Sequence, residues 1–238
     1  QQGELAWKVN ARAPSTLARW CNDNGAWLIP LSSDYVFSGW MADAYSESAL
    51  PCPLSEYGRS KLAGEQSVME SCDRAVVIRT GWLFSQYGKN RLCYMLNSAQ
   101  KSLKINVASD AYVSPTPAVS LAETMVEIAS LAEQGRIARG RYHFAGTPTA
   151  STYIFAGEML RQANELGLID RRCRLLPETI NPPGSGAMRP HNSALVSQKL
   201  PDLGIYPPDW RTELSATLEA IKERQSLGEP GLCQAFAS

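Results

Sequence analysis

A tyrosine and a lysine one helical turn apart are the residues of this chain best suited to chemistry. Tyr57 and Lys61 lie in a segment that the sequence predicts to be helical, and residues spaced by four share one helix face, roughly 6 Å apart at Cβ. A free tyrosine titrates at about pH 10 and is a poor acid unless a nearby cation favours the phenolate. Because the Lys61 ammonium can supply that charge, the pair predicts a proton donor.

Polar residues at the end of an apolar run strengthen this interpretation, because a Tyr-x-x-x-Lys spacing alone is weak evidence. Residues 27–31 form a short apolar run that predicts a buried strand, and Ser32, Ser33 and Asp34 follow it. In open α/β sheets, ligands bind at the carboxyl ends of the strands. There the Ser33 hydroxyl could hold the oxygen of a carbonyl substrate while Tyr57 protonates it, which predicts carbonyl reduction.

Alternating strands and helices must position these side chains, a pattern typical of an α/β fold with a parallel sheet. Pro14 is expected to kink or split the first helix, and the loop at 38–53 is long enough to fold over a pocket. Gly58 and Gly64 are expected to pack closely against the sheet. Apolar periodicity predicts helices at 4–24, 55–71, 91–101, 118–132 and 209–224, a further helix beginning near Ser151 or Thr152, and strands at 27–31, 75–78, 104–108 and 142–145.

Length and charge balance exclude several classes of protein. The 238 residues are enough for one large α/β domain or two small ones. With 23 Lys and Arg against 23 Asp and Glu, no general basic field attracts nucleic acid, which is not an expected partner. The longest apolar run, residues 26–31, is far below the roughly 20 residues of a membrane-spanning helix. Six scattered cysteines and only two histidines predict reduced thiols, no metal site and a cytoplasmic protein.

Several motifs together resemble the dTDP-4-dehydrorhamnose reductase family of extended short-chain dehydrogenase/reductases, over nearly the whole chain. Residues 32–39, Ser-Ser-Asp-Tyr-Val-Phe-Ser-Gly, are similar to the family's Ser-Thr-Asp-Tyr-Val-Phe-Asp-Gly. Residues 57–65 match its active-site helix almost letter for letter. Further matches are Arg79-Thr80-Gly81-Trp82, Pro115-Thr116, Tyr142-His143-Phe144-Ala145-Gly146 and the carboxyl-terminal signature from Arg189 to Leu195.

The resemblance implies reduction of the 4-keto group of dTDP-4-dehydro-6-deoxy-L-mannose to dTDP-L-rhamnose, with NADPH or NADH as hydride donor. The implied fold is a Rossmann-like doubly wound parallel sheet with a smaller α/β substrate-binding domain. Tyr57 would be the general acid, Lys61 would lower its pKa and hold the nicotinamide ribose, and Ser33 would bind the keto oxygen. The other implied contacts are Ser32 and Thr80 with the cofactor, and Asp34, Tyr35, Trp82, Arg189 and Asn192 with the substrate.

Some of these residues also have a structural interpretation. Trp82 could equally belong to the core, and Arg189 could be a surface ion-pair partner. Asp34 could brace its loop instead of touching substrate. The two histidines, His143 and His191, are expected to be structural.

Four positions depart from the family pattern. Ser33 replaces a threonine but keeps the hydroxyl. Ala111 and Val113 stand where the family has Gln and Gly, and Arg91 stands where it has phenylalanine. These departures leave the fit of the substrate, and so its identity, open.

The Gly-x-Gly-x-x-Gly fingerprint of dinucleotide-binding folds does not occur in the sequence. In this fold the glycine-rich turn comes first and leads into the helix that receives the pyrophosphate. We therefore expect residues 1–147 to be the C-terminal part of an NAD(P)-binding Rossmann domain that lacks roughly 70 residues, and this polypeptide to bind NADPH poorly. Residues 148–238 would be mainly the substrate-binding domain, to which residues 104–115 could also belong.

The sequence leaves three alternatives open: another nucleotide-sugar reductase or epimerase on the same scaffold, a non-catalytic regulatory subunit, and a truncated inactive product. The expected partner is a dTDP-linked keto-deoxy sugar. A homodimer is compatible with the sequence. The resemblance allows Mg²⁺, which no pattern of residues supports.

Overall fold

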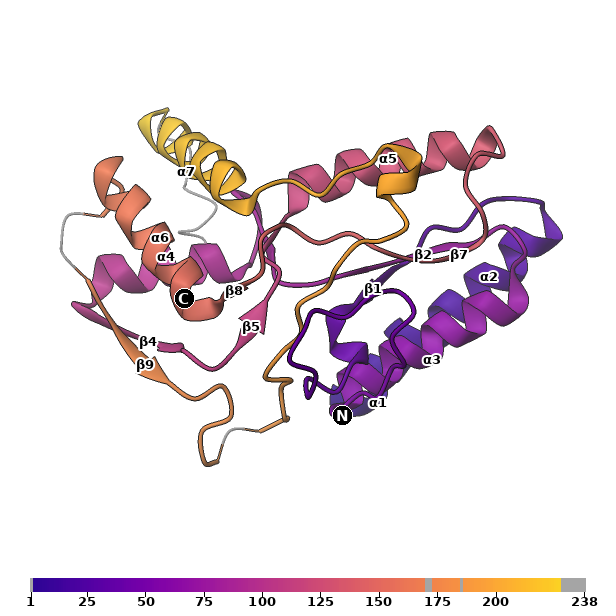
Figure 1. Cartoon of the computed structure of the whole chain (residues 1–238), viewed down its shortest axis with the longest axis horizontal. Helices are drawn as coiled ribbons and strands as arrows, with labels where there is room; N and C mark the ends of the chain where they lie inside the picture. The colour runs from indigo at the N-terminus through magenta and orange to yellow at the C-terminus, as the bar shows by residue number, and fades with distance from the viewer. Residues whose placement is uncertain (1, 170–172, 185, 228–238) are drawn as a thin grey trace.

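A three-stranded parallel sheet organises one side of the molecule. The computed structural model describes residues 2–169, 173–184 and 186–227. The strands lie in the order β1-β2-β7, with helices α2 and α3 on one face and α5 on the other (Figure 1). The predicted α/β class with parallel strands is confirmed. The bounds are β1 (Leu31–Ser33), β2 (Val76–Thr80), β7 (Gly140–His143), α2 (Ala13–Asp23), α3 (Glu56–Ser71) and α5 (Ala118–Glu133).

The sequence of β2 explains why both faces of this sheet are covered. All five of its residues are buried, as expected for a strand between two helical layers. Val76 and Ile78 pack with Leu121 and Ile128 of α5, while Val77 packs with α2 and α3 on the opposite face. The alternation follows from the two-residue period of side chains along a strand.

Strand β1 starts later than the sequence predicts. The apolar run at 27–31 predicts the strand, whereas the structure pairs residues 31–33 with β2 and leaves only an isolated bridge at Leu28. Pro30 separates the two because it has no N–H to donate to a sheet. The two serines therefore lie inside the strand, and Asp34 begins the 3₁₀ turn η2 (Asp34–Val36) that follows.

The first helix is irregular ahead of Pro14. Helix α1 (Gln2–Trp7) runs into a π-helical turn, η1 (Lys8–Arg12), before α2 resumes at Ala13. This wider turn places Pro14 in the first turn of α2, where the missing N–H is tolerated. The helix therefore changes type ahead of Pro14 but is not split, because the backbone stays helical at both ends of η1.

Gly58 and Gly64 of α3 let other segments come close, but these segments are not the sheet. A Cβ at Gly58 would collide with the carbonyl oxygen of Tyr35 in η2, and a Cβ at Gly64 with that of Asn10 in η1. The prediction of close packing is therefore right, whereas the predicted partner is wrong. Helix α3 is held against the turn that follows β1 and against the first helix.

A second group of elements has its own hydrophobic core on the other side of the molecule. Strands β4 and β9 form a parallel pair, with α4, α6 and α7 around them in the left half of Figure 1. Phe155 and Met159 of α6 and Trp210 and Leu218 of α7 are fully buried in this core. The bounds are α4 (Arg91–Lys101), β4 (Lys104–Ala108), α6 (Thr152–Glu165), β9 (Arg174–Glu178) and α7 (Trp210–Ser226).

The predicted bounds agree closely with this second group, except for β9. Helix α4 and strand β4 begin and end where the sequence predicts, and α6 begins at Thr152 with Ser151 as its N-cap. The sequence does not reveal β9, because four of its five residues are exposed and Pro177 interrupts the pattern. The remaining short elements are β3 (Leu83–Phe84), which pairs with β6 (Thr116–Pro117), β5 (Tyr112–Val113), which pairs with β8 (Ala150–Ser151), and η3 (Pro201–Leu203).

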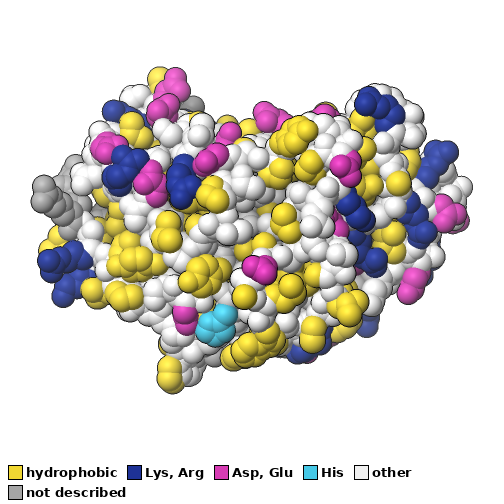
Figure 2. Space-filling view, viewed as in Figure 1, with side chains coloured by type: hydrophobic (Ala, Val, Ile, Leu, Met, Phe, Trp, Pro, Cys, Tyr) yellow, Lys and Arg dark blue, Asp and Glu magenta, His cyan; other side chains and the backbone are white. Residues whose placement is uncertain are grey.

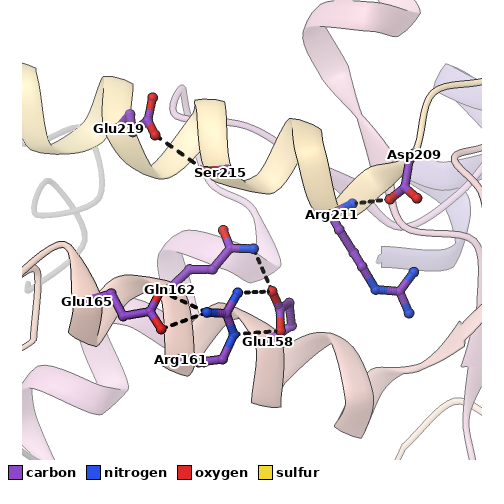
Figure 3. A network of polar contacts seen from close by, with 8 residues as sticks. All are labelled: Glu158, Arg161, Gln162, Glu165, Asp209, Arg211, Ser215 and Glu219. Atoms are coloured by element: carbon purple, nitrogen blue, oxygen red, sulfur yellow. Dashed lines mark hydrogen bonds and ion pairs between the residues drawn. The ribbon is translucent and has the colours of Figure 1, made fainter.

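Charged side chains decorate α6 and the start of α7 (Figure 3). Arg161 donates to Glu158 at 2.5 Å and to Glu165 at 2.7 Å, and its hydrogen bonds lower the pKa of Glu158 to about 2. At the start of α7, Asp209 accepts a hydrogen bond from the Arg211 N–H at 2.8 Å. Exposed pairs of this kind add little stability, so the packing of α6 on α7 rests on their shared core.

The segment 191–196, here called the central segment, joins the two groups of elements. On one side, the Tyr45 N–H donates to the Ala194 carbonyl at 2.8 Å. On the other, the Tyr112 N–H donates to the His191 carbonyl at 2.7 Å. The central segment therefore lies between the loop after β1 and strand β5, and fixes both.

Surface composition agrees with the balanced charge of the sequence. On the face in Figure 2, Lys and Arg side chains are interspersed with Asp and Glu. Among the described residues, no helix is long and apolar enough to cross a membrane. Cys21, Cys52, Cys72 and Cys173 carry free thiols, as predicted, whereas the prediction of a reduced thiol is wrong for Cys93.

Candidate active site

A cavity between the two groups of elements brings several predicted site residues together. Its volume is about 460 Å³, and its wall includes Ser33, Tyr35, Tyr57, Trp82 and Arg189. Ser33 is the last residue of β1, Tyr35 lies in the turn η2 that follows it, and Tyr57 lies in the first turn of α3. The cavity thus opens at the carboxyl end of the parallel sheet, where open α/β folds bind ligands. The loop at 38–53, which is expected to cover a pocket, is not part of the cavity wall.

Two hydroxyl groups meet on the cavity wall. The Ser33 hydroxyl donates to the Asp34 carboxylate at 2.9 Å and accepts from the Tyr35 N–H at 3.1 Å, which fixes its position. Burial raises the pKa of Tyr57, while a hydrogen bond with Ser33 acts in the opposite direction. Tyr57 is 43% exposed, so its phenol is partly shielded and still open to the cavity. The arrangement places the Tyr57 phenol beside the Ser33 hydroxyl, whose single proton can turn from Asp34 towards a bound oxygen atom.

Lys61 lies one turn further along α3 but contacts the sheet. Its ammonium donates to the Leu31 carbonyl at 3.3 Å. Burial lowers the pKa of Lys61, and the Glu65 carboxylate raises it. Lys61 is not part of the cavity wall, and the net shift of the Tyr57 pKa is upward, opposite in sign to the lowering expected from Lys61. The acidifying role of Lys61 stays a prediction.

Asp34 is buried beneath the cavity wall. Burial raises the pKa of its carboxyl to about 6, against hydrogen bonds with Ser193 and Ser33 that lower it. A Cβ at Gly81 would collide with this carboxyl, so the turn after β2 has room for it only because residue 81 is glycine. The structure places Asp34 as a brace for Ser33 and the turn after β1.

Tyr35 lies beside Tyr57, with their ring centroids 6.0 Å apart and edge to face. Burial raises the pKa of the Tyr35 phenol to about 12, and the Asp34 carboxylate adds to this increase. Two cations, Arg189 and Arg91, act in the opposite direction. The phenol therefore stays neutral at physiological pH and faces two guanidinium groups.

The predicted cofactor residues Ser32 and Thr80 lie behind the cavity wall. The Ser32 hydroxyl donates to Glu65 at 2.5 Å, and Glu65 is itself buried in ion pairs with Arg79 at 2.7 Å and Arg141 at 3.1 Å. The Thr80 hydroxyl is buried and has no hydrogen-bond partner in the described part of the chain. Ser32 is thus tied to a structural network, whereas Thr80 keeps an unused donor at the end of β2.

Trp82 has both of the roles that the sequence leaves open. Its ring packs edge to face on Phe155, with centroids 4.8 Å apart, and it also forms part of the cavity wall. Its φ of 48° lies in the left-handed region, which a large side chain rarely adopts. The backbone at this position is therefore held by its surroundings, and strain of this kind is concentrated at functional sites.

Arg189 and Asn192 lie close in sequence but differ in placement. The main chain of Arg189 is fixed by Asn181, whose amide exchanges two hydrogen bonds of 2.9 Å with it, and its side chain lines the cavity. Asn192 is buried, and its amide donates to the carbonyls of Met41, Ala42 and Asp43 at 2.9, 3.1 and 3.1 Å. Asn192 therefore fixes a loop and is absent from the cavity wall.

The second group of elements supplies cavity residues that are not among the predicted site residues. Arg91 and Tyr94 come from the first turn of α4, and Asn106 and Glu178 come from β4 and β9. Arg91 could have been found from its position directly after Asn90, which caps α4. Glu178 could not, because β9 itself has no clear pattern.

Neither histidine lies on the cavity wall. His143 is fully buried, and its Nδ1 lies 3.1 Å from the Tyr45 carbonyl. The Nδ1 of His191 lies 3.5 Å from the Asp110 carboxylate at the surface. No group of His, Cys, Asp and Glu suited to a metal ion occurs among the described residues.

Comparison with known proteins places this geometry in a family. Residues 1–223 match the family model described as the RmlD substrate binding domain. The chain is 31% identical over 221 residues to dTDP-4-dehydrorhamnose reductase of Escherichia coli (strain K12), which covers 92% of this chain and 73% of the relative. It is also 31% identical over 220 residues to dTDP-4-keto-6-deoxy-D-glucose reductase of Streptomyces niveus, with the same coverage of 92% and 73%.

A solved structure has the same arrangement of elements. The crystal structure of dTDP-4-dehydrorhamnose reductase from Bacillus anthracis in complex with NADP superimposes with a TM-score of 0.83 at 29% identity, covering 92% of this chain and 74% of that one. The predicted Rossmann-like α/β fold and the resemblance in sequence are thereby confirmed.

Proposed function

Because the chain belongs to the dTDP-4-dehydrorhamnose reductase family, we propose that it reduces the 4-keto group of dTDP-4-dehydro-6-deoxy-L-mannose to dTDP-L-rhamnose with NADPH. The observation that carries the proposal is that the Tyr57 and Ser33 hydroxyl groups lie close together on the wall of a cavity at the carboxyl end of the sheet. Two O–H groups side by side suit a carbonyl oxygen that gains negative charge during reduction.

The residues at this edge of the sheet fit a nicotinamide cofactor. Lys61 uses one N–H on the Leu31 carbonyl and keeps two donors for ribose hydroxyls. The unpartnered Thr80 hydroxyl at the end of β2 would hold a further polar group after a small rotation. NADPH supplies a hydride to the carbonyl carbon when bound. Ser32 is also predicted to contact the cofactor. Because its hydroxyl is bonded to Glu65, it would support this edge of the sheet and would not bind the cofactor directly.

The proton comes from this chain's own residues. As the carbon–oxygen π pair moves to oxygen, the single proton of the Ser33 hydroxyl turns from the Asp34 carboxylate to donate a hydrogen bond to that oxygen, and Tyr57 transfers its phenolic proton to it. Burial raises the pKa of Tyr57, which keeps the phenol protonated at neutral pH. Transfer remains favourable because the alkoxide formed by hydride addition is a far stronger base than a phenolate, and water then reprotonates Tyr57.

The substitution Tyr57→Phe tests this proposal. It removes the proton donor but keeps the ring beside Tyr35, so we expect NADPH oxidation with the keto sugar, measured at saturating NADPH, to fall by about 10²-fold or more. Tyr206→Phe, at an exposed tyrosine, is the matched control and should retain the rate. Circular dichroism and thermal unfolding would verify that both variants fold. A Tyr57→Phe enzyme of undiminished rate would overturn the proposal.

A second candidate is reduction of a dTDP-linked 4-keto-6-deoxy-D-glucose. The similarity to the Streptomyces niveus enzyme of that name, also at 31% identity, favours it. The same two hydroxyls would perform the chemistry, and the two candidates differ only in the sugar that the cavity accepts. Comparing kcat/KM for the two keto sugars, with products identified by NMR, decides between them.

Assembly, location and domain division stay predictions. We propose a homodimer in the cytoplasm, to be tested by light scattering and by fractionation of cells that produce the protein. If two domains meet between residues 147 and 148, a protease should cut the folded protein near this boundary. Helix α4 and strand β4, which precede the boundary, share a hydrophobic core with α6 and α7, which follow it. Added Mg²⁺ should leave the activity unchanged.

A further inference from the structure

Two arginines face the cavity from opposite segments of the chain. Arg91 is the first residue of α4, Arg189 follows β9, and both are exposed residues of the cavity wall. Both lower the pKa of the phenol of Tyr35, which lies on the same wall. Tyr35 in turn contacts Tyr57. The two cations, Tyr35 and the proposed proton donor thus belong to the wall of one cavity.

In the part of the chain that the structure describes, neither guanidinium has an anionic partner. Among the residues that the structure describes, no hydrogen bond or ion pair involves the side chain of Arg91 or Arg189. Glu178 is the one carboxylate on the described part of the cavity wall, and it pairs with neither. The titratable wall thus has a net charge of about +1 at neutral pH, with Arg91 and Arg189 outweighing Glu178.

The main chain under each arginine is fixed, although the side chains are free. Asn90 caps α4 by accepting from the Cys93 N–H at 3.2 Å and donates to the carbonyls of Ser85 and Tyr87 at 2.9 and 3.1 Å. Asn181 holds the main chain of Arg189 in the same manner. Binding an anion therefore has to order the two side chains, but not the main chain beneath them.

We propose that Arg91 and Arg189 together grip the diphosphate of a nucleotide sugar, and that Arg91 is a binding residue particular to this chain. The choice of ligand class rests on the proposed function, since a diphosphate links the sugar to the nucleoside there. A guanidinium presents paired N–H groups that match phosphate oxygens, and two of them balance the two charges of the diphosphate. Gripped at this end, the substrate extends past Tyr35 and places its sugar beside Tyr57 and Ser33.

Titration calorimetry with dTDP and with thymidine tests this grip. Arg91→Gln should weaken dTDP binding by about tenfold or more and leave thymidine binding unchanged. Arg91→Lys keeps the positive charge but loses the paired N–H groups of the guanidinium, so its dTDP affinity should lie between those of the parent and Arg91→Gln. Added salt should weaken dTDP binding more in the parent protein than in Arg91→Gln, because salt screens the attraction between the Arg91 guanidinium and the diphosphate, which the variant lacks. The matched control is Arg19→Gln, at an exposed arginine on α2, which should bind dTDP like the parent.

The outcomes separate this inference from the proposed function. The inference is overturned if Arg91→Gln binds dTDP as tightly as Arg19→Gln does, or if the parent protein does not bind dTDP. It is also overturned if Arg91→Gln weakens thymidine binding as much as dTDP binding. In turnover assays we expect a raised KM and a nearly unchanged kcat for Arg91→Gln. Full turnover by Tyr57→Phe would instead overturn the function and leave the dTDP result standing.

Discussion

Asp34→Asn is expected to stabilise the protein at neutral pH, although Asp34 is buried at the centre of the site. Burial raises the pKa of this carboxyl from 3.8 to about 6, a difference of about 2 pH units. At 1.36 kcal/mol per unit, ionised Asp34 lowers the free energy of unfolding by about 3 kcal/mol. The asparagine cannot ionise, yet it keeps an oxygen that can accept from Ser33.

The gain must depend on pH in one direction. Since the folded-state pKa lies above the unfolded value, the native state binds the proton more tightly, and the stability from this group is complete below about pH 4 and is lost as the pH rises through about 6. Asp34→Asn also disturbs the hydrogen bond with Ser193, at about 1 kcal/mol. We therefore expect a loss of about 1 kcal/mol near pH 4 and a gain of about 2 kcal/mol near pH 7.5.

Urea denaturation near these two pH values measures the difference in unfolding free energy between variant and parent. Other titrating groups cancel in that difference. Asp23→Asn, at an exposed aspartate on α2, is the matched control and should give the same small difference at both pH values. The reasoning is refuted if the difference for Asp34→Asn does not change with pH.

Two further predictions concern buried charge. Glu65→Gln should lower the free energy of unfolding by about 3 kcal/mol, because it leaves Arg79 buried beside a neutral amide; urea denaturation measures this, and a loss below 1 kcal/mol would contradict it. Burial lowers the pKa of His143 to about 4, so its imidazole should stay neutral down to about pH 5 and its protonation in the unfolded chain should weaken the fold as the pH falls from about 6.5. NMR titration of the imidazole follows this directly, and a midpoint above pH 6 would show the reasoning wrong.

Local patterns predict much of the fold. Helix α4 and strand β4 follow from apolar periodicity alone, and the change of helix type before α2 follows from Pro14, because each depends on the chemistry of its own segment. The predicted start of β1 is wrong. The apolar run suggests a strand from residue 27, but Pro30 has no N–H to donate, so regular pairing begins only at Leu31. Strand β9 is exposed and is stabilised by pairing with β4, which no local pattern contains.

The candidate site is predictable where one segment builds it. Ser33 and Tyr57 could be named because their types and spacing carry the chemistry, and both are found on the cavity wall. The direction of a side chain is not predictable in this way. The Asn192 side chain binds a loop and the Ser32 side chain binds Glu65, because buried polar groups form hydrogen bonds with the partners that the folded chain brings near them. The position of Arg91 directly after the Asn90 cap is visible in the sequence, whereas its place on the cavity wall emerges only in three dimensions.

The central segment has a consequence for biosynthesis. Asn192 contacts carbonyl groups that precede it by 149 to 151 residues, so a very long stretch of polypeptide must be closed before the loop at 38–53 is secured. During translation, the early strands and α3 leave the ribosome well before their final partner exists. A nascent chain that holds Tyr57 and Ser33 is therefore without a finished cavity until synthesis is nearly over, and the folding rate should be limited by this late closure.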